Sequence, residues 1–331
     1  MLTLFIMARE KAIDIVKGIG ILLVVWDHFG LNFHLEISIF HMPLFFFISG
    51  FWHNQSISWK KMILNKTKRL LVPAFSFIIL FLIFYAVIGI WDPTKIQMIL
   101  HNWNVLYPSS YIDNPIWFLF ALFNVTLMFQ YISLQTSPFL GMFCMFCLSF
   151  LGTKLPQLPF YLTSSFVCLP FFALGFYYHK SSYYNDKKIN VILFIIAVLL
   201  YSWAIYNRSI IDVAALVFGT SYMMFFLPAL GGGIVVIFLS RFIANFNFSS
   251  ILEKWGNNSL GIMGIHNPLQ YYVLSPVPML TTFLLVELGL DGEVNYRRCA
   301  KILFLLFFII LFLLSHYISL FLKKKMPRLF G

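Results

Sequence analysis

Charged side chains are scarce in this sequence. Asp, Glu, Lys and Arg make up only 11% of its 331 residues, whereas hydrophobic residues make up 60%. A soluble globular domain carries about 25% charged residues. A chain this apolar has too little polar surface to cover a fold in water. The composition therefore excludes an ordinary soluble domain and indicates that the lipid bilayer is part of the solvent.

Long polar segments are missing as well. The sequence contains no polar stretch long enough for an appended soluble domain, no internal repeat and no low-complexity linker. In a bilayer, a chain of this length has room for about ten helices of roughly 20 residues with short loops. We therefore predict an all-α, polytopic integral membrane protein with about ten transmembrane helices and a single membrane-embedded domain over residues 1–331.

Common catalytic and nucleotide-binding motifs are absent. There is no G-x-S-x-G, no G-x-G-x-x-G and no P-loop in the sequence. Two of the four cysteines, Cys144 and Cys147, form a C-x-x-C, but it lies in an apolar run. Redox and zinc pairs need a polar or electropositive setting. We interpret these cysteines as packing residues and expect no metal.

Ten apolar runs separated by polar breaks are the candidate membrane spans. They cover residues 15–33, 39–53, 70–91, 116–134, 138–153, 160–178, 189–206, 213–239, 259–275 and 301–322. The ninth is the weakest, because His266, Asn267 and Pro268 interrupt it. Residues 279–290 are a candidate for a further short or re-entrant helix.

The basic residues test this number of spans. With the N-terminus in the cytoplasm, 17 of the 23 lysines and arginines fall on the cytoplasmic side. By the positive-inside rule, this distribution supports ten spans with both termini cytoplasmic. The topology also explains the net charge of +11 without a nucleic-acid partner.

The first span, DIVKGIGILLVVWDH, carries ionisable side chains within an apolar sequence. Such groups are costly in a membrane and are therefore candidate functional residues. Lys17 and His28 are 11 residues apart. This spacing is about three helical turns, so they share one face about 16 Å apart, and Asp14 lies near the same stripe. The alternative is an interfacial Asp–Lys pair and a histidine at the outer boundary.

His28 is the candidate catalytic residue of this stripe. Histidine is a natural general base for a hydroxyl at neutral pH. His28 would act directly on an acceptor hydroxyl or carry the acyl group itself, and the sequence leaves both routes open. A triad of Asp27, His28 and Ser49 is disfavoured, because adjacent residues project about 100° apart on a helix.

Three other side chains each have two interpretations. His41 opens the second span, FHMPLFFFISGF, and suits a ligand contact or a structural hydrogen bond. The same alternatives hold for His266, whose neighbour Asn267 helps to break the ninth span. Trp117 lies near the outer end of its span and would line a substrate cavity or anchor the helix at the interface.

Two loops have compositions that suit substrates. The inner segment WKKMILNKTKRLLVP contains Lys66 and Arg69. It fits a topological signal that contacts anionic lipid heads, or a cradle for the phosphates of a cytosolic donor such as coenzyme A. The outer loop 92–115 contains Trp103, Tyr107 and Tyr111, which suit sugar binding or an interfacial belt.

These pieces resemble a known family, the type-3 membrane acyltransferases. The matching sequences are DIVKGIGILLVVWDH, FHMPLFFFISGF, KTKRLLVP, PIWFL and NNSLGIMGIHNP. The family pattern of a basic residue, ten intervening residues and a histidine corresponds to Lys17 and His28, and its basic-x-x-Arg pair corresponds to Lys66 and Arg69. The combination is similar to the fucose acetylase-like group. Asp27 departs from the pattern, since a small residue is common there.

The resemblance implies transfer of an acyl group, usually from acetyl coenzyme A, to a hydroxyl of a surface glycan or its lipid-linked precursor at a bacterial inner membrane. We therefore assign residues to three roles. The catalytic candidates are Asp14, Lys17 and His28, the donor-binding candidates are Lys66 and Arg69, and the substrate-binding candidates are His41, Trp117 and His266.

The main alternative function is a transporter or flippase of a lipid-linked sugar, which would share the spans and the intramembrane charges. The single-helix stripe beside a basic inner loop, without paired half-helix repeats, argues against it. A membrane polymerase or glycosyltransferase is a further alternative. Such an enzyme would be expected to have larger outer loops with several acidic residues or arginines.

Overall fold

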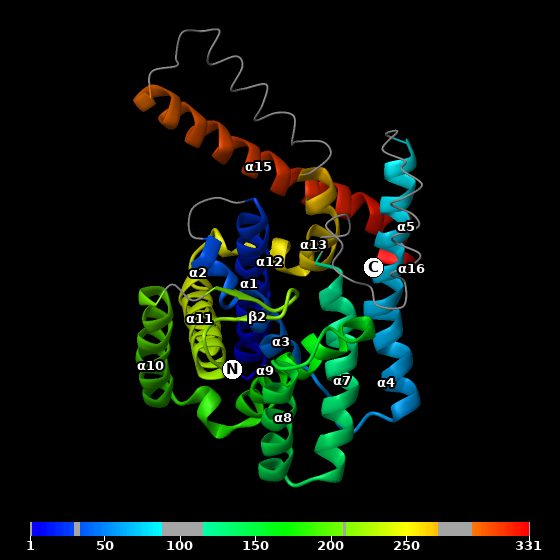
Figure 1. Ribbon diagram of the computed structural model, residues 1–331, viewed down its shortest axis with the longest axis vertical. Helices are drawn as coiled ribbons and strands as arrows, with labels where there is room; N and C mark the ends of the chain where they lie inside the picture. The colour runs from blue at the N-terminus through cyan, green and yellow to red at the C-terminus, as the bar shows by residue number, and fades with distance from the viewer. Residues whose placement is uncertain (1, 30–33, 88–114, 208–209, 271–292, 331) are drawn as a thin grey trace.

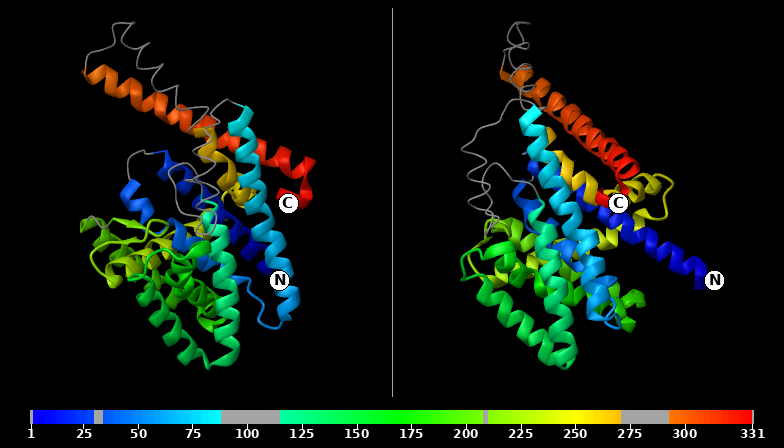
Figure 2. Two further views of the ribbon diagram at one scale, coloured as in Figure 1. Left: turned by 45° about the vertical axis from the view of Figure 1, so that its right-hand side comes forward. Right: turned by 90° about the vertical axis from the view of Figure 1, so that its right-hand side faces the viewer.

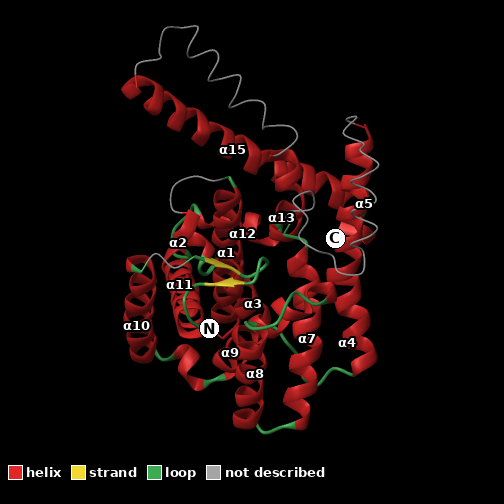
Figure 3. Cartoon of the chain, viewed as in Figure 1, coloured by secondary structure: helices red, strands yellow, loops and turns green. Residues whose placement is uncertain are grey.

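The computed structural model describes residues 2–29, 34–87, 115–207, 210–270 and 293–330. Within these ranges the protein is almost entirely helical, with one two-stranded antiparallel hairpin (Figures 1 and 3). The elements are α1 (Leu2–His28), α2 (His34–Ser38), α3 (His41–Phe51), α4 (Trp59–Lys66), η1 (Thr67–Leu71), α5 (Val72–Val87), α7 (Trp117–Gln135), α8 (Pro138–Gly152), η2 (Pro159–Tyr161), α9 (Leu162–Lys180), η3 (Ser182–Asn185), α10 (Lys187–Tyr206), β1 (Ile211–Asp212), β2 (Val217–Phe218), α11 (Tyr222–Ile243), α12 (Ser249–Asn257), α13 (Ser259–Pro268), α15 (Glu293–Lys325) and α16 (Pro327–Phe330).

Six helical segments among the described residues are long and apolar enough to cross a membrane. They are Trp59–Phe84, Trp117–Gln135, Pro159–Lys180, Lys187–Tyr206, Tyr222–Ile243 and Phe304–Lys325. The helical fold class is thus confirmed, but the predicted number of about ten spans is not. The apolar segments Glu36–Phe51 and Pro138–Gly152 are helical but shorter.

The starts of two helices follow from the local sequence. The Ser137 side chain accepts a hydrogen bond from the backbone N–H of Leu140 at 3.4 Å, so α8 begins at Pro138. The Asp186 carboxylate accepts from the backbone N–H of Lys188 at 2.9 Å at the start of α10. Short polar side chains before an apolar run satisfy the free N–H groups of a helix start and therefore fix its position.

One predicted span begins in the wrong place. The prediction put residues 213–239 in one span, but the β1–β2 hairpin occupies its first part and α11 begins only at Tyr222. The Asp212 carboxylate accepts hydrogen bonds from the N–H groups of Ala214 and Ala215 at 2.9 and 3.0 Å. An aspartate that binds its own following backbone stabilises a turn, and this replaces the predicted helical turns.

The ninth predicted span, 259–275, is also different within the described residues. There α13 has ten residues and ends at Pro268. The candidate helix 279–290 lies outside the described residues, as do the aromatic side chains of the loop 92–115 that are candidates for sugar binding.

Figure 2 shows α15 lying obliquely across one end of the helical bundle.

The helix pair α3 and α9 forms the tightest part of the core. A Cβ atom on Gly50 would meet the backbone carbonyl of Phe172, and one on Gly175 would meet that of Phe47. Glycine allows two helix backbones to approach this closely, which is typical of packing between membrane helices. The result is a rigid platform whose first turn carries His41.

Candidate active site

The helix α1 brings Asp27 and His28 to the end of its last turn, beside α13 and α3. Helix α12 holds α1 in place at its middle. A Cβ on Gly18 would meet the backbone carbonyl of Leu252, and one on Gly256 would meet that of Asp14. Because this crossing leaves no room for side chains, α1 has little freedom to slide, and the position of His28 is well defined.

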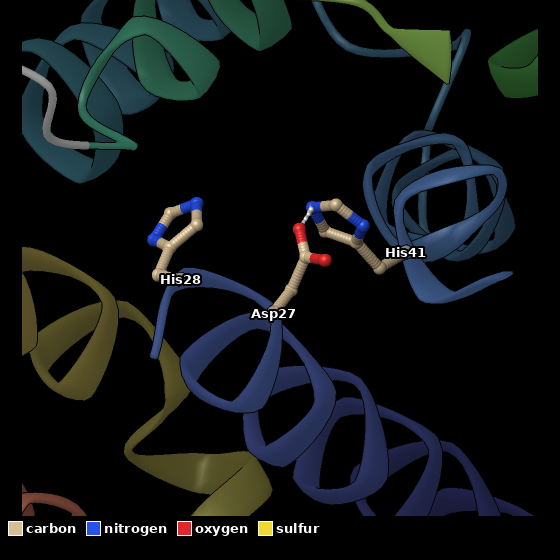
Figure 4. Close-up of side chains that lie close together, drawn as sticks. All are labelled: Asp27, His28 and His41. Carbon is tan, nitrogen blue, oxygen red and sulfur yellow. Dashed lines mark ion pairs between the residues drawn. The ribbon is translucent and has the colours of Figure 1, made fainter. Parts of the chain in front are cut away.

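Three ionisable side chains meet at this end of α1 (Figure 4). Asp27 and His28 come from α1 and His41 comes from α3, and their donor and acceptor atoms lie within 4.8 Å of one another. The Nε2 atom of His41 lies 3.8 Å from the Oδ2 atom of Asp27. Asp27 and His41 are buried, with 4% and 6% of their surface exposed.

Helix α13 supplies the second set of contacts to His28. The Nδ1 atom of His28 lies 2.9 Å from Nε2 of His266 and 3.1 Å from Oδ1 of Asn267. The two imidazole rings are stacked, with 5.1 Å between centroids and 19° between planes. His266 is fully buried, so its contact with His28 is sheltered from solvent.

These contacts determine which nitrogen of His28 carries the hydrogen. Nδ1 of His266 lies 3.1 Å from the carbonyl oxygen of Ile262. A carbonyl oxygen only accepts hydrogen bonds, so Nδ1 of His266 is the donor. The other nitrogen of neutral His266, Nε2, is therefore an acceptor. His28 Nδ1 therefore lies between two acceptors, Nε2 of His266 and the amide oxygen of Asn267. The network assigns the hydrogen of neutral His28 to Nδ1 and leaves the lone pair on Nε2.

The same reasoning applies to His41. Its Nδ1 lies 3.0 Å from the carbonyl oxygen of Ile37 and must donate to it. Nε2 is then the atom of His41 that faces the Asp27 carboxylate, 3.8 Å away. The site thus combines a proton acceptor, Nε2 of His28, with the close pair of Asp27 and His41.

Gln270 completes the surroundings of His28. Its Nε2 donates to the backbone carbonyl of His28 at 2.7 Å and so satisfies a free carbonyl at the end of α1. Among the described residues, the Oε1 atom of Gln270 is buried and has no hydrogen-bond partner. This oxygen is therefore a candidate acceptor for a substrate hydroxyl.

The triad of Asp27, His28 and Ser49, which the sequence analysis disfavours, does not form. Asp27 is paired with His41 rather than with His28. The hydroxyl of Ser49 donates to the backbone carbonyl of Phe45 at 2.7 Å. The divergence of adjacent residues on a helix explains this result.

Asp14 and Lys17 lie at the other end of the stripe. Their side chains form an ion pair of 2.8 Å and are 21% and 31% exposed. The structure places both on α1 with His28, but three turns of helix separate them from it. The structure shows the Asp–Lys pair, and both its position at the membrane interface and its catalytic role remain predictions.

The donor-binding candidates lie on a different part of the fold. Lys66 ends α4 and is half-buried, and Arg69 lies in the π-helical turn η1 and is exposed. Figure 1 places α4 in the lower half of the molecule, whereas α13 is in the upper half. Single π-helical turns are frequent at functional sites. The structure does not bring Lys66 and Arg69 to the histidine cluster.

Trp117 lies in the aromatic core. Its ring centroid is 6.4 Å from that of Phe46 and 6.0 Å from that of Tyr161, and only 9% of its surface is exposed. This environment does not fit an anchor at a membrane interface, where the ring would contact water and lipid. Its substrate contact remains a prediction.

The side chains of Asp27, His28 and His41 are of the types that bind transition metals. However, the 3.8 Å between His41 Nε2 and Asp27 Oδ2 exceeds the roughly 3.4 Å between neighbouring ligand atoms of tetrahedral zinc. The site would have to contract to hold an ion. We therefore retain the prediction of a metal-free site.

Sequence reasoning missed the most important neighbours of His28. The sequence identifies Asn267 only as a helix breaker and gives no signal for Gln270, and it indicates Asp27 only as a member of a disfavoured triad and a departure from the family pattern. Asn267 could have been found, because an amide in an apolar span needs a partner. The pairing with His28 could not, since it joins residues 239 positions apart.

The apolar helices and the buried histidine cluster define a helical membrane protein with a buried polar site. A family model described as an acyltransferase domain matches residues 10–324, essentially the whole chain. The chain therefore belongs to the acyltransferase 3 family and is a membrane acyltransferase, which confirms the resemblance. No curated protein matches the chain. No solved structure matches it either.

Proposed function

We propose that this acyltransferase moves an acetyl group from acetyl coenzyme A to a hydroxyl of a surface polysaccharide or its lipid-linked precursor, at a bacterial inner membrane. The observation that carries this proposal is the arrangement around His28. Nδ1 is held by His266 and Asn267, which leaves Nε2 to accept a proton. Family membership supplies the acyl-transfer chemistry.

In the proposed reaction, Nε2 of His28 takes the proton of the acceptor hydroxyl as its oxygen attacks the thioester carbonyl. The new C–O bond forms, the C–S bond breaks, and the thiolate of coenzyme A receives the proton. A route through a covalent acyl-histidine is the other option. In either case His266 and Asn267 keep the imidazole in one orientation.

The Asp27–His41 pair has a complementary role in this proposal. Negative charge develops on the carbonyl oxygen as the hydroxyl adds, and a preorganised donor stabilises it. His41 lies beside His28, and an N–H group at its Nε2 atom would be such a donor. We thus propose that His41 contacts substrate, as predicted, and that His266 acts by positioning His28.

The donor approaches from the cytoplasmic side in this model. Lys66 and Arg69 bind the phosphates of coenzyme A, since cationic side chains form strong hydrogen bonds with phosphate. Lys17 lies at the end of the stripe opposite His28 and places its ammonium group, paired with Asp14, on the side that we assign to the donor. Both termini are cytoplasmic, so a reporter that is active only in the periplasm should be silent when fused after Gly331.

Mass spectrometry of the surface polysaccharide, with and without the gene, tests the function. Loss of an acetyl mass increment from an otherwise intact glycan is the expected result. Loss of the whole glycan would instead favour a transporter of a lipid-linked sugar. An unchanged glycan mass would contradict the proposed acceptor.

A further inference from the structure

A second feature lies away from the histidine cluster, between α3, α9, α10 and α11. It is an apolar cavity of about 130 Å³, partly open, whose walls include Phe47, Leu174, Leu193, Ile234 and Phe238. Apolar cavities of about 150 Å³ stay dry and accept hydrocarbon ligands. The chemistry of the walls therefore selects a hydrocarbon occupant rather than water or a sugar.

The surroundings of the cavity indicate where such an occupant comes from. Helix α10 forms one wall and is an outer helix of the bundle (Figure 1). Only 17% of its most apolar stretch is buried, against 72% for α9. Its apolar side chains Val191, Ile192 and Ile195 are more than half exposed. In a membrane this face contacts lipid, so acyl chains surround the cavity.

A cation lies one helical turn from the cavity. Arg241 follows the wall residue Phe238 by three positions on α11, about 4.5 Å along the helix. Its guanidinium group lies 4.6 Å from the ring centroid of Tyr184 and 5.3 Å from that of Phe238. Stacking on two rings and a hydrogen bond with the Tyr178 side chain hold the planar group in place, and the guanidinium has further N–H groups for an anion.

Three lysines share this end of the bundle. Lys180 ends α9, while Lys187 and Lys188 begin α10 after a short connection. The nearby Asp186 caps α10, so its carboxylate is bound to backbone N–H groups. Within the part of the chain that the structure describes, neither these lysines nor Arg241 form an ion pair with a carboxylate. This end is thus strongly positive.

We propose that the cavity and its basic end form a binding site for an anionic phospholipid. One acyl chain enters the cavity, and the phosphate group binds Arg241, with the lysines adding attraction. Basic side chains at a membrane surface select anionic headgroups. Two features together distinguish this site from ordinary lipid contact. They are an apolar cavity and a stacked arginine one helical turn away. The proposal does not depend on the acyl-transfer mechanism.

Native mass spectrometry of the detergent-purified full chain tests this inference. Dioleoylphosphatidylglycerol and dioleoylphosphatidylcholine are added together, and the retained lipid is counted. We expect preferential retention of phosphatidylglycerol. Arg241→Ala should weaken this retention about fivefold, the effect of one basic residue at a membrane surface. Arg241→Lys should weaken it less, because the charge remains.

Three further variants separate the effect of the site from general charge and surface effects. Ile234→Trp fills the cavity and should abolish the preference, whereas Leu239→Trp, on the exposed face of the same helix, should keep it. Arg328→Ala removes an exposed cation elsewhere and should also keep it. Equal retention of the two lipids by the unmodified protein would overturn the proposal. So would wild-type retention by Ile234→Trp, or equal losses in Arg241→Ala and Arg328→Ala.

Discussion

The stripe on α1 that runs from Asp14 and Lys17, at the middle of the helix, to His28, at its last residue, has different kinds of partners at its two ends. At one end, Lys17 contacts Asp14 on the next turn of the same helix, and both side chains remain partly exposed. At the other end, His28 contacts His266 and Asn267, which lie 238 and 239 positions further along the chain. One end is a local ion pair, and the other is a buried junction between distant helices.

This difference predicts different costs for substitutions at the two positions. A partly exposed ion pair contributes about 0–1 kcal/mol and tolerates replacement. A buried polar group that loses its partner costs about 1–3 kcal/mol, and its orientation changes with the loss. If the catalytic chemistry occurs at the buried end, substitutions there should affect activity far more than substitutions at the exposed end.

The largest effect is expected at His28. Removal of a general base reduces rates by roughly 10²–10⁴-fold, and removal of a covalent carrier reduces them more. His28→Ala should therefore abolish acyl transfer while the protein remains in the membrane. The measurement is the acyl content of the glycan, normalised to membrane-bound protein. Near-normal acylation would move the reacting group away from this end of α1.

His41→Gln should have the next largest effect. Removal of one donor to an oxyanion costs about 10²–10³-fold in kcat. Ser49→Ala on the same helix is the matched control, because the Ser49 hydroxyl is already bound to the backbone of Phe45. Single-turnover rates with saturating donor give the comparison. Equal rates for the two variants would remove His41 from the chemistry.

The features that the sequence predicts correctly depend on residues that are close together in the chain. The span predicted at 189–206 corresponds closely to α10 (Lys187–Tyr206), and His28 stood out as a histidine in an apolar helix. The hairpin β1–β2 was missed because its apolar residues continue into those of α11, and short apolar runs do not reveal their secondary structure. The contact between α1 and α13 was missed because the sequence does not show which distant helices lie side by side.

Asn267→Ala tests whether Asn267 positions the imidazole of His28. Without the amide oxygen, His28 Nδ1 keeps only His266, and misorientation of a reacting group costs up to about 100-fold in rate. The decrease should appear in kcat, with the KM for the donor unchanged. Asn258→Ala is the control, since this buried asparagine binds His316 and not the histidine cluster. Matching losses of kcat in both variants would indicate general damage to the fold.

Changing Lys66 and Arg69 together to Ala should weaken donor use. Hydrogen bonds to a charged group contribute about 1.5–3 kcal/mol each, so the KM for acetyl coenzyme A should rise about tenfold or more. The double variant Lys60→Ala, Lys61→Ala removes the same charge from exposed positions of α4 and serves as the control. If both double variants raise KM equally, the loop acts only through its net charge.

The smallest effect is expected at Lys17. This variant tests most directly the comparison between the two ends of the stripe, Lys17 and His28. Loss of a partly exposed ion pair is worth at most about 1 kcal/mol, so Lys17→Ala should lower acylation by about fivefold or less. Lys17→Arg should retain activity, because arginine preserves the positive charge opposite Asp14. Acyl content per membrane-bound protein is measured beside His28→Ala in the same strain background. A loss in Lys17→Ala as large as that in His28→Ala, without rescue by arginine, would mean that the ammonium group takes part in the reaction. The two ends of the stripe would then have to be treated as one catalytic unit.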